Sequence, residues 1–337
     1  MKIVVYGATG HTGQFVVAEL QRRGLDPVVA GRDAGKLTAM YGNLTSVPAA
    51  ADDPRALDRA LDGAAAVINT AGPFALTAGP LVEAALRAGL PYVDVAAEIE
   101  ANRDTLTTYA DRARRQGTIV LPAMAFYGGL GDLLVTHAMG DWTSADTAEI
   151  AYGLSSWQPT PGTRAAGQVS HDRRGGRRVR FTKGALEYHD DPLTQGTWDF
   201  PEPLGSQQVV HGFTMADVVT IPSHLAIPEV RTSMAIQAAQ DLADPTTPAP
   251  TSSDQTFVVD VVVTSNGEQR RTTASGCDIY AVTAPLAVEA VQRILDGRTR
   301  TVGATTAGNL FHPADFLQAL EPFLIVTTSA QLTPTRR

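Results

Sequence analysis

The sequence contains a single cysteine, Cys277, and only three lysines, Lys2, Lys36 and Lys183. One cysteine excludes an internal disulfide framework and a cluster of thiolate metal ligands, and it fits a reducing compartment such as the cytoplasm. So few lysines leave almost no candidate for a Schiff base. None of the eight tyrosines has a lysine four residues later, so the Tyr-x-x-x-Lys pair of short-chain dehydrogenases is absent.

Positive charge and long apolar runs are also scarce. The net charge of -8 argues against a nucleic-acid partner, because a phosphate-binding surface normally needs a basic excess. The one basic run, Arg173 to Arg180, contains two glycines and is interpreted as a solvated turn. No segment approaches the roughly 18 uninterrupted apolar residues of a membrane span, and the first apolar run is too short for a signal peptide. The seven histidines show no pair at helical metal-ligand spacing, so we expect no metal.

The most informative feature that is present is a glycine-rich run near the start of the chain, Gly7-Ala8-Thr9-Gly10-His11-Thr12-Gly13. It follows the β-branched stretch from Ile3 to Val5 and precedes an amphipathic segment, Phe15 to Arg22. Strand, glycine turn and helix in this order are typical of a dinucleotide-binding crossover, in which the helix N-terminus binds the diphosphate. Any tight strand-to-helix turn also favours glycine. We expect a diphosphate to be bound by Gly7, Thr9, Gly10, His11, Thr12 and Gly13.

Strand-like and helix-like segments alternate regularly from Lys2 to about Met124. After the first strand, further strands are expected at 27–30, 46–49, 65–70, 92–95 and 118–121. Helices are expected at 15–23, 34–40, 54–61, 78–88 and 100–116. Such alternation predicts a parallel sheet covered on both faces, with ligands at the carboxyl ends of its strands.

Beyond Gly128-Gly129-Leu130-Gly131 the pattern changes to longer strands and to loops rich in proline or glycine, such as 158–162 and 244–253. Asn266-Gly267 between two apolar stretches predicts a hairpin, and a helix is expected at 285–295. The predicted fold class is α/β, a Rossmann-type doubly wound parallel sheet plus a second α+β domain with a mostly antiparallel sheet. We place the Rossmann domain at 1–127, the second domain at 128–284, and a segment that packs back on the first domain at 285–330. An exposed face or edge of the second sheet could support a homodimer.

Arg32 follows the second expected strand, where an acidic residue would bind the ribose hydroxyls of NAD. An arginine there can instead pair with the 2′-phosphate of NADP, and Lys36 could add a second positive charge. We therefore expect NADP(H), although both side chains could also belong to an ordinary solvated loop. After the fourth strand, the small residues of Ala71-Gly72-Pro73-Phe74 suit the nicotinamide ribose. Phe74 could form a wall for the nicotinamide ring or belong to the core.

These stretches carry a family resemblance. The glycine run, Ala30-Gly31-Arg32, the stretch from Ala71 to Val95 and the late Tyr280-Ala281-Val282-Thr283-Ala284-Pro285 resemble the saccharopine dehydrogenase-like oxidoreductases, including their trans-acting enoyl reductase branch. The resemblance implies a Rossmann domain that binds NADP(H), a middle α/β domain that covers the nicotinamide cleft, and a C-terminal segment packed on the first domain. The chain departs from many relatives at 125–132, which lacks their Gly-Phe-Asp-Ser-x-Pro-Ser-Asp type of loop.

Hydride transfer to a polarised double bond usually needs a proton donor for the second atom. Tyr127, after the sixth strand, is the first candidate, and a core or lid tyrosine is the alternative. Asp94 and Glu98 follow the fifth strand at the same edge, where a carboxyl group could be an acid, orient an amine, or cap a helix. The middle domain also contributes four histidines that could reach the cleft: His171, His189, His211 and His224.

Three functions fit these residues. The saccharopine branch suggests reduction of a C=N bond in a small organic or amino-acid-derived substrate, with Arg164 and Arg231 available for a carboxylate. The enoyl reductase branch suggests reduction of a C=C bond in a polyketide-like or lipid-like acceptor, with the apolar segment 218–227 as a pocket wall. A non-catalytic NADP(H)-binding regulator is the third.

Overall fold

The computed structural model describes residues 1–202, 204–250 and 254–329. Seven parallel strands form the first sheet, in the order β15-β6-β5-β4-β1-β2-β3. These strands are β1 (Lys2–Tyr6), β2 (Asp26–Gly31), β3 (Ser46–Pro48), β4 (Ala66–Asn69), β5 (Tyr92–Asp94), β6 (Ile119–Leu121) and β15 (Gly303–Ala304). The expected doubly wound parallel sheet is confirmed, and all five strands expected after β1 are present with small shifts at their ends.

Helices cover both faces of this sheet. They are α1 (His11–Arg22), α2 (Ala34–Tyr41), α3 (Pro54–Leu61), α4 (Phe74–Ala88) and α5 (Ile99–Gln116). Ile3 and Val5 of β1 belong to the core that contains α1, whereas Val4 and Tyr6 belong to the core that contains α3 and α4. Because successive strand residues point to opposite faces, a strand buried on both sides is continuously apolar, as β1 is.

The second sheet has nine strands, mostly antiparallel, with one parallel pair between β7 and β12. They are β7 (Thr147–Leu154), β8 (Arg178–Thr182), β9 (Ala185–His189), β10 (Thr194–Asp199), β11 (Ser206–His211), β12 (Glu229–Ala235), β13 (Thr256–Ser265), β14 (Glu268–Cys277) and β16 (Leu324–Ser329). The expected hairpin joins β13 to β14, and both Asn266 and Gly267 have positive φ, as its tight turn requires. The loop expected at 244–253 is described as far as residue 250.

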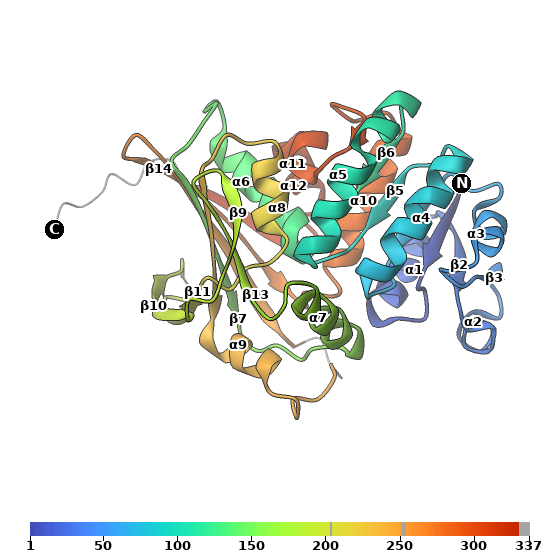
Figure 1. The fold of residues 1–337 in the computed structure, drawn as a ribbon, viewed down its shortest axis with the longest axis horizontal. Helices are drawn as coiled ribbons and strands as arrows, with labels where there is room; N and C mark the ends of the chain where they lie inside the picture. Colours follow the sequence, from blue (N-terminus) through green and yellow to red (C-terminus); the bar gives the residue numbers. More distant parts are fainter. Residues whose placement is uncertain (203, 251–253, 330–337) are drawn as a thin grey trace.

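The remaining elements connect or cover the two sheets. They are the kinked turn η1 (Phe126–Leu130), in which Tyr127 and Gly128 have non-helical backbone angles, α6 (Gly131–Met139), α7 (Pro161–Arg173), α8 (Asp217–Thr220), the 3-10 turn η2 (Ile221–Ser223), α9 (Ile236–Ala243), α10 (Thr283–Leu295), α11 (Ala307–Leu310) and α12 (Pro313–Ala319). In Figure 1 the first sheet and the second sheet occupy opposite ends of the molecule, with α5, α8 and α10 between them. No helix in the described part of the chain is both long and apolar enough to cross a membrane.

The segment after residue 284 contributes to both sheets. Helix α10 packs against α1, and β15 extends the first sheet beside β6, as expected for a segment that returns to the first domain. The last strand differs from that expectation, because β16 pairs with β14 in the second sheet. Leu324 is its buried residue and most of the others are exposed, which suits an edge strand, and the sequence contains no turn signal that would reveal its partner.

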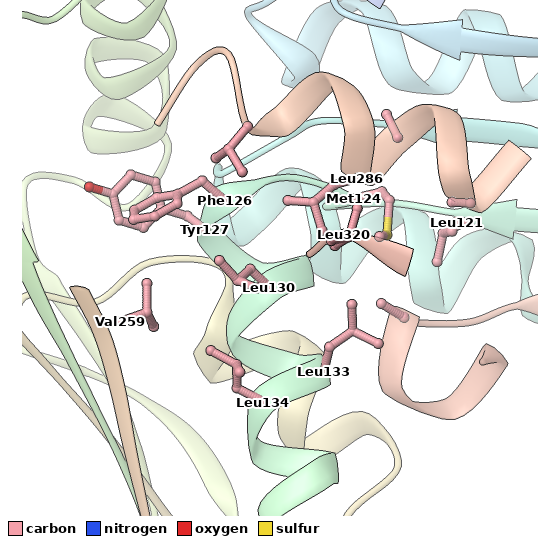
Figure 2. Close-up of a cluster of buried hydrophobic side chains, with 14 of the residues drawn as sticks. Leu121, Met124, Phe126, Tyr127, Leu130, Leu133, Leu134, Val259, Leu286 and Leu320 are labelled. Atoms are coloured by element: carbon pink, nitrogen blue, oxygen red, sulfur yellow. The ribbon is translucent and has the colours of Figure 1, made fainter. Parts of the chain in front are cut away.

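One apolar cluster joins the two sheets. It contains core residues of β6 and η1 together with residues of α6, β13 and α10. Figure 2 shows ten labelled members: Leu121, Met124, Phe126, Tyr127, Leu130, Leu133, Leu134, Val259, Leu286 and Leu320. Because this core is continuous, the first and second sheets are held in a fixed relation by ordinary side-chain packing.

Buried ion pairs link α1 to α10. The Glu289 carboxylate accepts hydrogen bonds from Arg23 Nη1 at 2.5 Å and from Arg293 Nε at 2.7 Å. All three side chains are largely buried. Removing one partner of such a group leaves the other charges buried without compensation.

We therefore predict that Glu289→Ala lowers the free energy of unfolding by about 3 kcal/mol, measured by urea denaturation. Asp58→Ala is the control, because its pair with Arg87 is largely exposed and should contribute less than about 1 kcal/mol. Equal effects of the two substitutions would contradict a stabilising role for the buried pairs.

Candidate functional site

The glycine-rich turn between β1 and α1 forms a cradle that a side chain would fill. Gly7 has φ +86, and a Cβ there would lie 2.8 Å from the Ala71 backbone nitrogen. A Cβ on Gly13 would collide with Gly7 O and lie 2.9 Å from Ala8 Cα. Gly10 is the N-cap of α1 and supplies no side-chain cap, so the first N–H groups of the helix stay available. The turn therefore offers backbone donors to an anion at a helix N-terminus.

His11 begins α1 and faces the second half of the molecule. Its ring lies edge-on to Phe15 at 5.2 Å and to Tyr280 at 5.1 Å. Its Nε2 atom is buried and has no hydrogen-bond partner among the described residues. Burial lowers the pKa of His11, against the opposing effect of Asp278, so the ring stays neutral near pH 7. Thr9 and Thr12 are partly exposed on the same turn.

Arg32 lies at the end of β2, next to the glycine turn, and is exposed. It forms no ion pair within residues 1–202, 204–250 and 254–329, so its guanidinium group is available for a ligand. Lys36 Nζ lies 3.9 Å from Asp33 Oδ2, and both side chains are well exposed. Asp33 also caps α2 by accepting a hydrogen bond from Lys36 N. Arg32 and Lys36 are thus both exposed, and their binding of the 2′-phosphate of NADP stays a prediction.

The loop Ala71–Phe74 lies beside the glycine turn, as the contact between Gly7 and Ala71 shows. The peptide bond between Gly72 and Pro73 is cis. Phe74 begins α4, four residues earlier than expected, because the Glu98 carboxylate accepts hydrogen bonds from Phe74 N at 2.6 Å and Ala75 N at 3.1 Å. Glu98 therefore caps a helix, although the helix is α4 rather than the one that follows Glu98.

Two candidate site residues, Phe74 and Asp94, are buried at this edge of the first sheet. Phe74 packs with small residues of α4 and α5, which favours its interpretation as a core residue. Asp94 has no exposed surface, and its carboxylate accepts hydrogen bonds from Tyr92 OH at 2.8 Å, Ala96 N at 3.0 Å and Ala123 N at 2.9 Å. These contacts tie the loop after β5 to the loop after β6. A catalytic role for Asp94 stays a prediction to which they add no support.

Tyr127 lies in η1, at the junction of the two sheets. Its ring stacks near Trp157 at 5.3 Å and near Tyr152 at 4.9 Å, and only 6% of the residue is exposed. The hydroxyl group points away from the leucine side chains of the core (Figure 2) and is buried without a partner among the described residues. Burial raises the pKa of Tyr127 well above its ordinary value, so the phenol is protonated at every pH of interest.

Tyr280 joins the glycine turn to the second sheet. Its hydroxyl oxygen lies 3.0 Å from Trp157 Nε1 and 3.0 Å from Thr163 Oγ1. Thr160 caps α7, and a Cβ on Gly72 would lie 3.8 Å from Gly162 O, so the start of α7 covers the loop Ala71–Phe74. In the sequence, Tyr280 belongs to the stretch 280–285 that resembles the saccharopine dehydrogenase-like oxidoreductases, and we predicted no role for it.

A cavity of about 260 Å³ opens at this junction. Its lining includes two carboxylates and no lysine or arginine, and comprises Ser156, Gln158, Pro250, Asp254, Gln255, Asp278 and Tyr280. Asp278 is buried, with φ 56, and its Oδ1 accepts hydrogen bonds from Tyr280 N and Ala281 N. A larger hollow of about 390 Å³ at the β13–β14 hairpin is lined by none of the expected site residues.

The middle-domain arginines do not form a carboxylate site. Arg164 donates to the backbone oxygens of Leu242, Asp244 and Thr247. Arg231 is exposed on β12, where it lies near two glutamates. Segment 218–227 is also different from the expectation, because Val218 and three other apolar residues of it are core residues rather than a pocket wall.

The four histidines of the middle domain have different neighbours and do not form one site. His171 is exposed, His189 lies near Asp191, and His211 Nδ1 lies 2.9 Å from Ser233 Oγ. His224 Nε2 lies 2.6 Å from the buried Asp132 Oδ1. The described residues contain no group of three or more His, Cys, Asp or Glu side chains that could hold a metal ion.

Comparison with known proteins accounts for the glycine turn. A family model for the saccharopine dehydrogenase NADP binding domain matches residues 3–121. Residues 3–121 belong to this domain family. The match spans β1 to β6, so this NADP-binding domain is the first sheet with its helices, apart from β15 and α10. The expected cofactor, NADP(H), is confirmed at the level of the domain.

Several curated proteins are similar to this chain over less than half of its length. A trans-acting enoyl reductase of Mycobacterium ulcerans (strain Agy99) is 31% identical over 159 residues, which cover 44% of this chain and 38% of the relative. A lipid droplet localized protein of Caenorhabditis elegans is 33% identical over 181 residues, 48% of this chain and 42% of the relative. A human saccharopine dehydrogenase-like oxidoreductase is 25% identical over 167 residues, covering 43% and 39%. The aligned part spans about two fifths of each of these relatives.

The whole chain has the fold of a solved enzyme. Apo saccharopine dehydrogenase (L-Glu forming) from Saccharomyces cerevisiae superposes with a TM-score of 0.67, at 12% identity, over 98% of this chain and 100% of that chain. The similarity shows that the two sheets together form one known fold.

The residues present fit NADP(H). The Gly7 and Gly13 cradle admits a diphosphate where a Cβ would block it, and Arg32 is an unpaired cation within the described ranges. When bound, the cofactor supplies a hydride. That the loop after β4 binds the nicotinamide ribose stays a prediction.

We predict that Arg32→Ala weakens NADPH binding by about 10- to 100-fold and leaves NADH binding nearly unchanged, because a charge-assisted contact to the 2′-phosphate is worth roughly 1.5–3 kcal/mol. Fluorescence titration with each dinucleotide measures both constants. Arg115→Ala, at an exposed arginine near the end of α5, is the matched control. Equal loss of NADPH and NADH affinity in Arg32→Ala would contradict this role.

Asp94 provides a prediction on pH. Burial raises the pKa of Asp94 to about 6, although hydrogen bonds from Ala96 and Ala123 oppose the shift. Since the folded pKa lies above the ordinary value, the Asp94 contribution to stability is fully present below about pH 4 and declines as pH rises through about 6. We predict that Asp94→Asn reduces the loss of unfolding free energy between pH 5 and pH 8 by on the order of 1.5 kcal/mol. An unchanged pH dependence in urea denaturation would refute this assignment.

Proposed function

We propose that this protein is an NADP(H)-dependent oxidoreductase that transfers a hydride to a polarised double bond, most readily the C=N bond of a small amine-derived acceptor. The NADP-binding domain and the cavity beside Tyr280 support the proposal together. The cavity adjoins the glycine turn through the contact between Tyr280 and His11. An acceptor bound there lies against the covered end of the cofactor site.

We choose the class of acceptor from the charge of the side chains that line the cavity. Asp254 and Asp278 are the charged residues in its lining. A protonated imine is a cation, and carboxylates within a few ångströms of a partly buried cation favour it. An acceptor with a free carboxylate has less support, because Arg164 and Arg231 are both occupied or turned outward. Of the two acceptors expected from the sequence, a small organic one and an amino-acid-derived one, we therefore favour the small organic acceptor that lacks a carboxylate.

The residues of this chain would act on the acceptor in three ways. The start of α7 and Tyr280 cover the loop Ala71–Phe74 and exclude water from it. Asp278 stabilises a positive acceptor. Tyr127 is the proposed proton donor to the amine nitrogen that forms once the carbon of the protonated imine has received the hydride, because it is a protonated, unpartnered group at the same junction.

A second candidate is reduction of a C=C bond, which the trans-acting enoyl reductase relative favours. The aromatic side chains of Tyr127, Trp157 and Phe213 form contacts along one side of the junction and suit an apolar acceptor. A non-catalytic NADP(H)-binding regulator is the outcome in which no acceptor is reduced.

We predict that the purified protein oxidises NADPH with 1-pyrroline faster than with 2-cyclohexen-1-one or crotonyl-coenzyme A, measured by absorbance of NADPH. Asp278→Asn should lower kcat/KM for 1-pyrroline by about 10-fold, since asparagine keeps the backbone hydrogen bonds and tolerates positive φ but carries no charge. Asp244→Asn, at an exposed carboxylate outside the cavity, is the control.

Preference for the enone or the thioester would favour the C=C candidate. Turnover of none of the three, with intact NADPH binding, would favour the regulator.

A further inference from the structure

A second titratable group lies behind Tyr127. Tyr152 of β7 is fully buried, and its hydroxyl group donates a hydrogen bond to Asp217 Oδ1 of α8 at 2.8 Å. The rings of Tyr127 and Tyr152 lie 4.9 Å apart. Three segments far apart in the sequence, η1, β7 and α8, thus bring two phenols and one carboxyl group together at the junction of the sheets.

Two polar atoms of this cluster lack a hydrogen-bond partner among the described residues. Tyr127 OH and Asp217 Oδ2 are both buried and have no hydrogen-bond partner among the described residues. An unpartnered buried polar atom costs about 1–3 kcal/mol, and such atoms are rare in folded proteins. Two of them in side chains that both contact Tyr152 indicate a site for a polar group or for a proton.

The backbone is shaped to hold Asp217 in this place. A Cβ on Gly131 would collide with the Asp217 carboxylate and lie 3.1 Å from Tyr152 OH. A Cβ on Gly128 would lie 2.8 Å from Ala216 Cβ. The glycines of 128–131 therefore allow α8 to approach η1 closely.

The charges around Asp217 favour its protonated form. Burial raises the pKa of Asp217 to about 6; the hydrogen bond from Tyr152 and the backbone N–H groups of Asp217 and Gly128 oppose this shift, and the nearby Asp132 adds to it. Asp132 is itself held by His224 and by Gly308 N. Within the described ranges no lysine or arginine forms an ion pair with Asp217.

We infer that Asp217 holds the proton that restores the Tyr127 hydroxyl group in the proposed reduction. The inference rests on the proposed function. Tyr127 OH gives its proton to the amine nitrogen that forms once the carbon of the protonated imine has received the hydride, which leaves a phenolate. Because the two atoms form no direct hydrogen bond, the proton on Asp217 Oδ2 then passes to the Tyr127 oxygen through a bridging water molecule, and the resulting carboxylate takes up a proton from solvent. Tyr152 is a positioning residue, because it holds Oδ1 and leaves Oδ2 free to carry the proton.

The first test needs no acceptor. Infrared difference spectra of the protein between pH 5 and pH 8 should show the carbonyl stretch of a protonated carboxyl group that is missing in Asp217→Asn. Tyr152→Phe should raise the midpoint of this band by on the order of one pH unit, since it removes a hydrogen bond to the carboxylate. Tyr127→Phe should shift the frequency of the same band. Asp94→Asn removes a different buried carboxyl group and should leave the Asp217 band in place.

The second test uses 1-pyrroline, or whichever probe of the panel is reduced. The rate should fall as pH rises through about 6, and Asp217→Asn should abolish this limb of the profile whereas Asp94→Asn keeps it. Tyr127→Phe should lower kcat by about 100-fold or more, and adding Asp217→Asn to it should cost no further activity.

The outcomes separate the inference from the proposed function. Absence of the Asp217 band, or a band that does not respond to Tyr127→Phe, overturns the inference whether or not an acceptor is reduced. The inference is also overturned if an acceptor is reduced and Asp217→Asn leaves the pH–rate profile unchanged. It is overturned as well if the losses of kcat in Tyr127→Phe and Asp217→Asn add up in the double variant. If no probe is reduced, the proposed function fails. An Asp217 carbonyl band that shifts in Tyr127→Phe would still support a proton held between Asp217 and Tyr127.

Discussion

Burial of the short segment from Phe126 to Gly131 between the two sheets is the constraint on which the rest of the structure depends. The segment leaves the first sheet after β6 and enters α6, which packs under the second sheet. Every residue of it is buried, so its shape is set from both sides. The single apolar core in Figure 2 results from this arrangement and holds the NADP-binding domain against the second sheet. Tyr127 is thereby placed where the sheets meet, close to Trp157 and Tyr152.

The same burial explains the unusual acids of the junction. Asp94 and Asp217 both lie in surroundings that disfavour charge, which raises the pKa of each to about 6. They differ in their partners. Asp94 satisfies backbone N–H groups of two loops, whereas Asp217 keeps one oxygen atom open. A buried carboxyl group that stabilises a loop and one that is available for proton transfer can therefore have similar acidity.

Local signals in the sequence predicted most of the fold. The glycine run, the alternation of apolar segments and Asn266-Gly267 depend on neighbouring residues, so the first sheet, its helices and the hairpin followed from them. Long-range pairing was not predictable in this way. The partner of β16, the cap that Glu98 supplies to α4, and the cluster of Tyr127, Tyr152 and Asp217 depend on residues 24 to more than 60 positions apart. The engagement of Arg164 by backbone carbonyl oxygens is likewise invisible in a single sequence.

The most direct measurement of the account is a crystal structure of the protein with NADP+. The account predicts the diphosphate at the N-terminus of α1, the 2′-phosphate beside Arg32, and the nicotinamide ring between the loop Ala71–Phe74 and the junction, with its reactive face toward the cavity lined by Asp278 and Tyr280. A nicotinamide ring directed away from the second sheet, with Tyr127 on the far side of intact core packing, would contradict it.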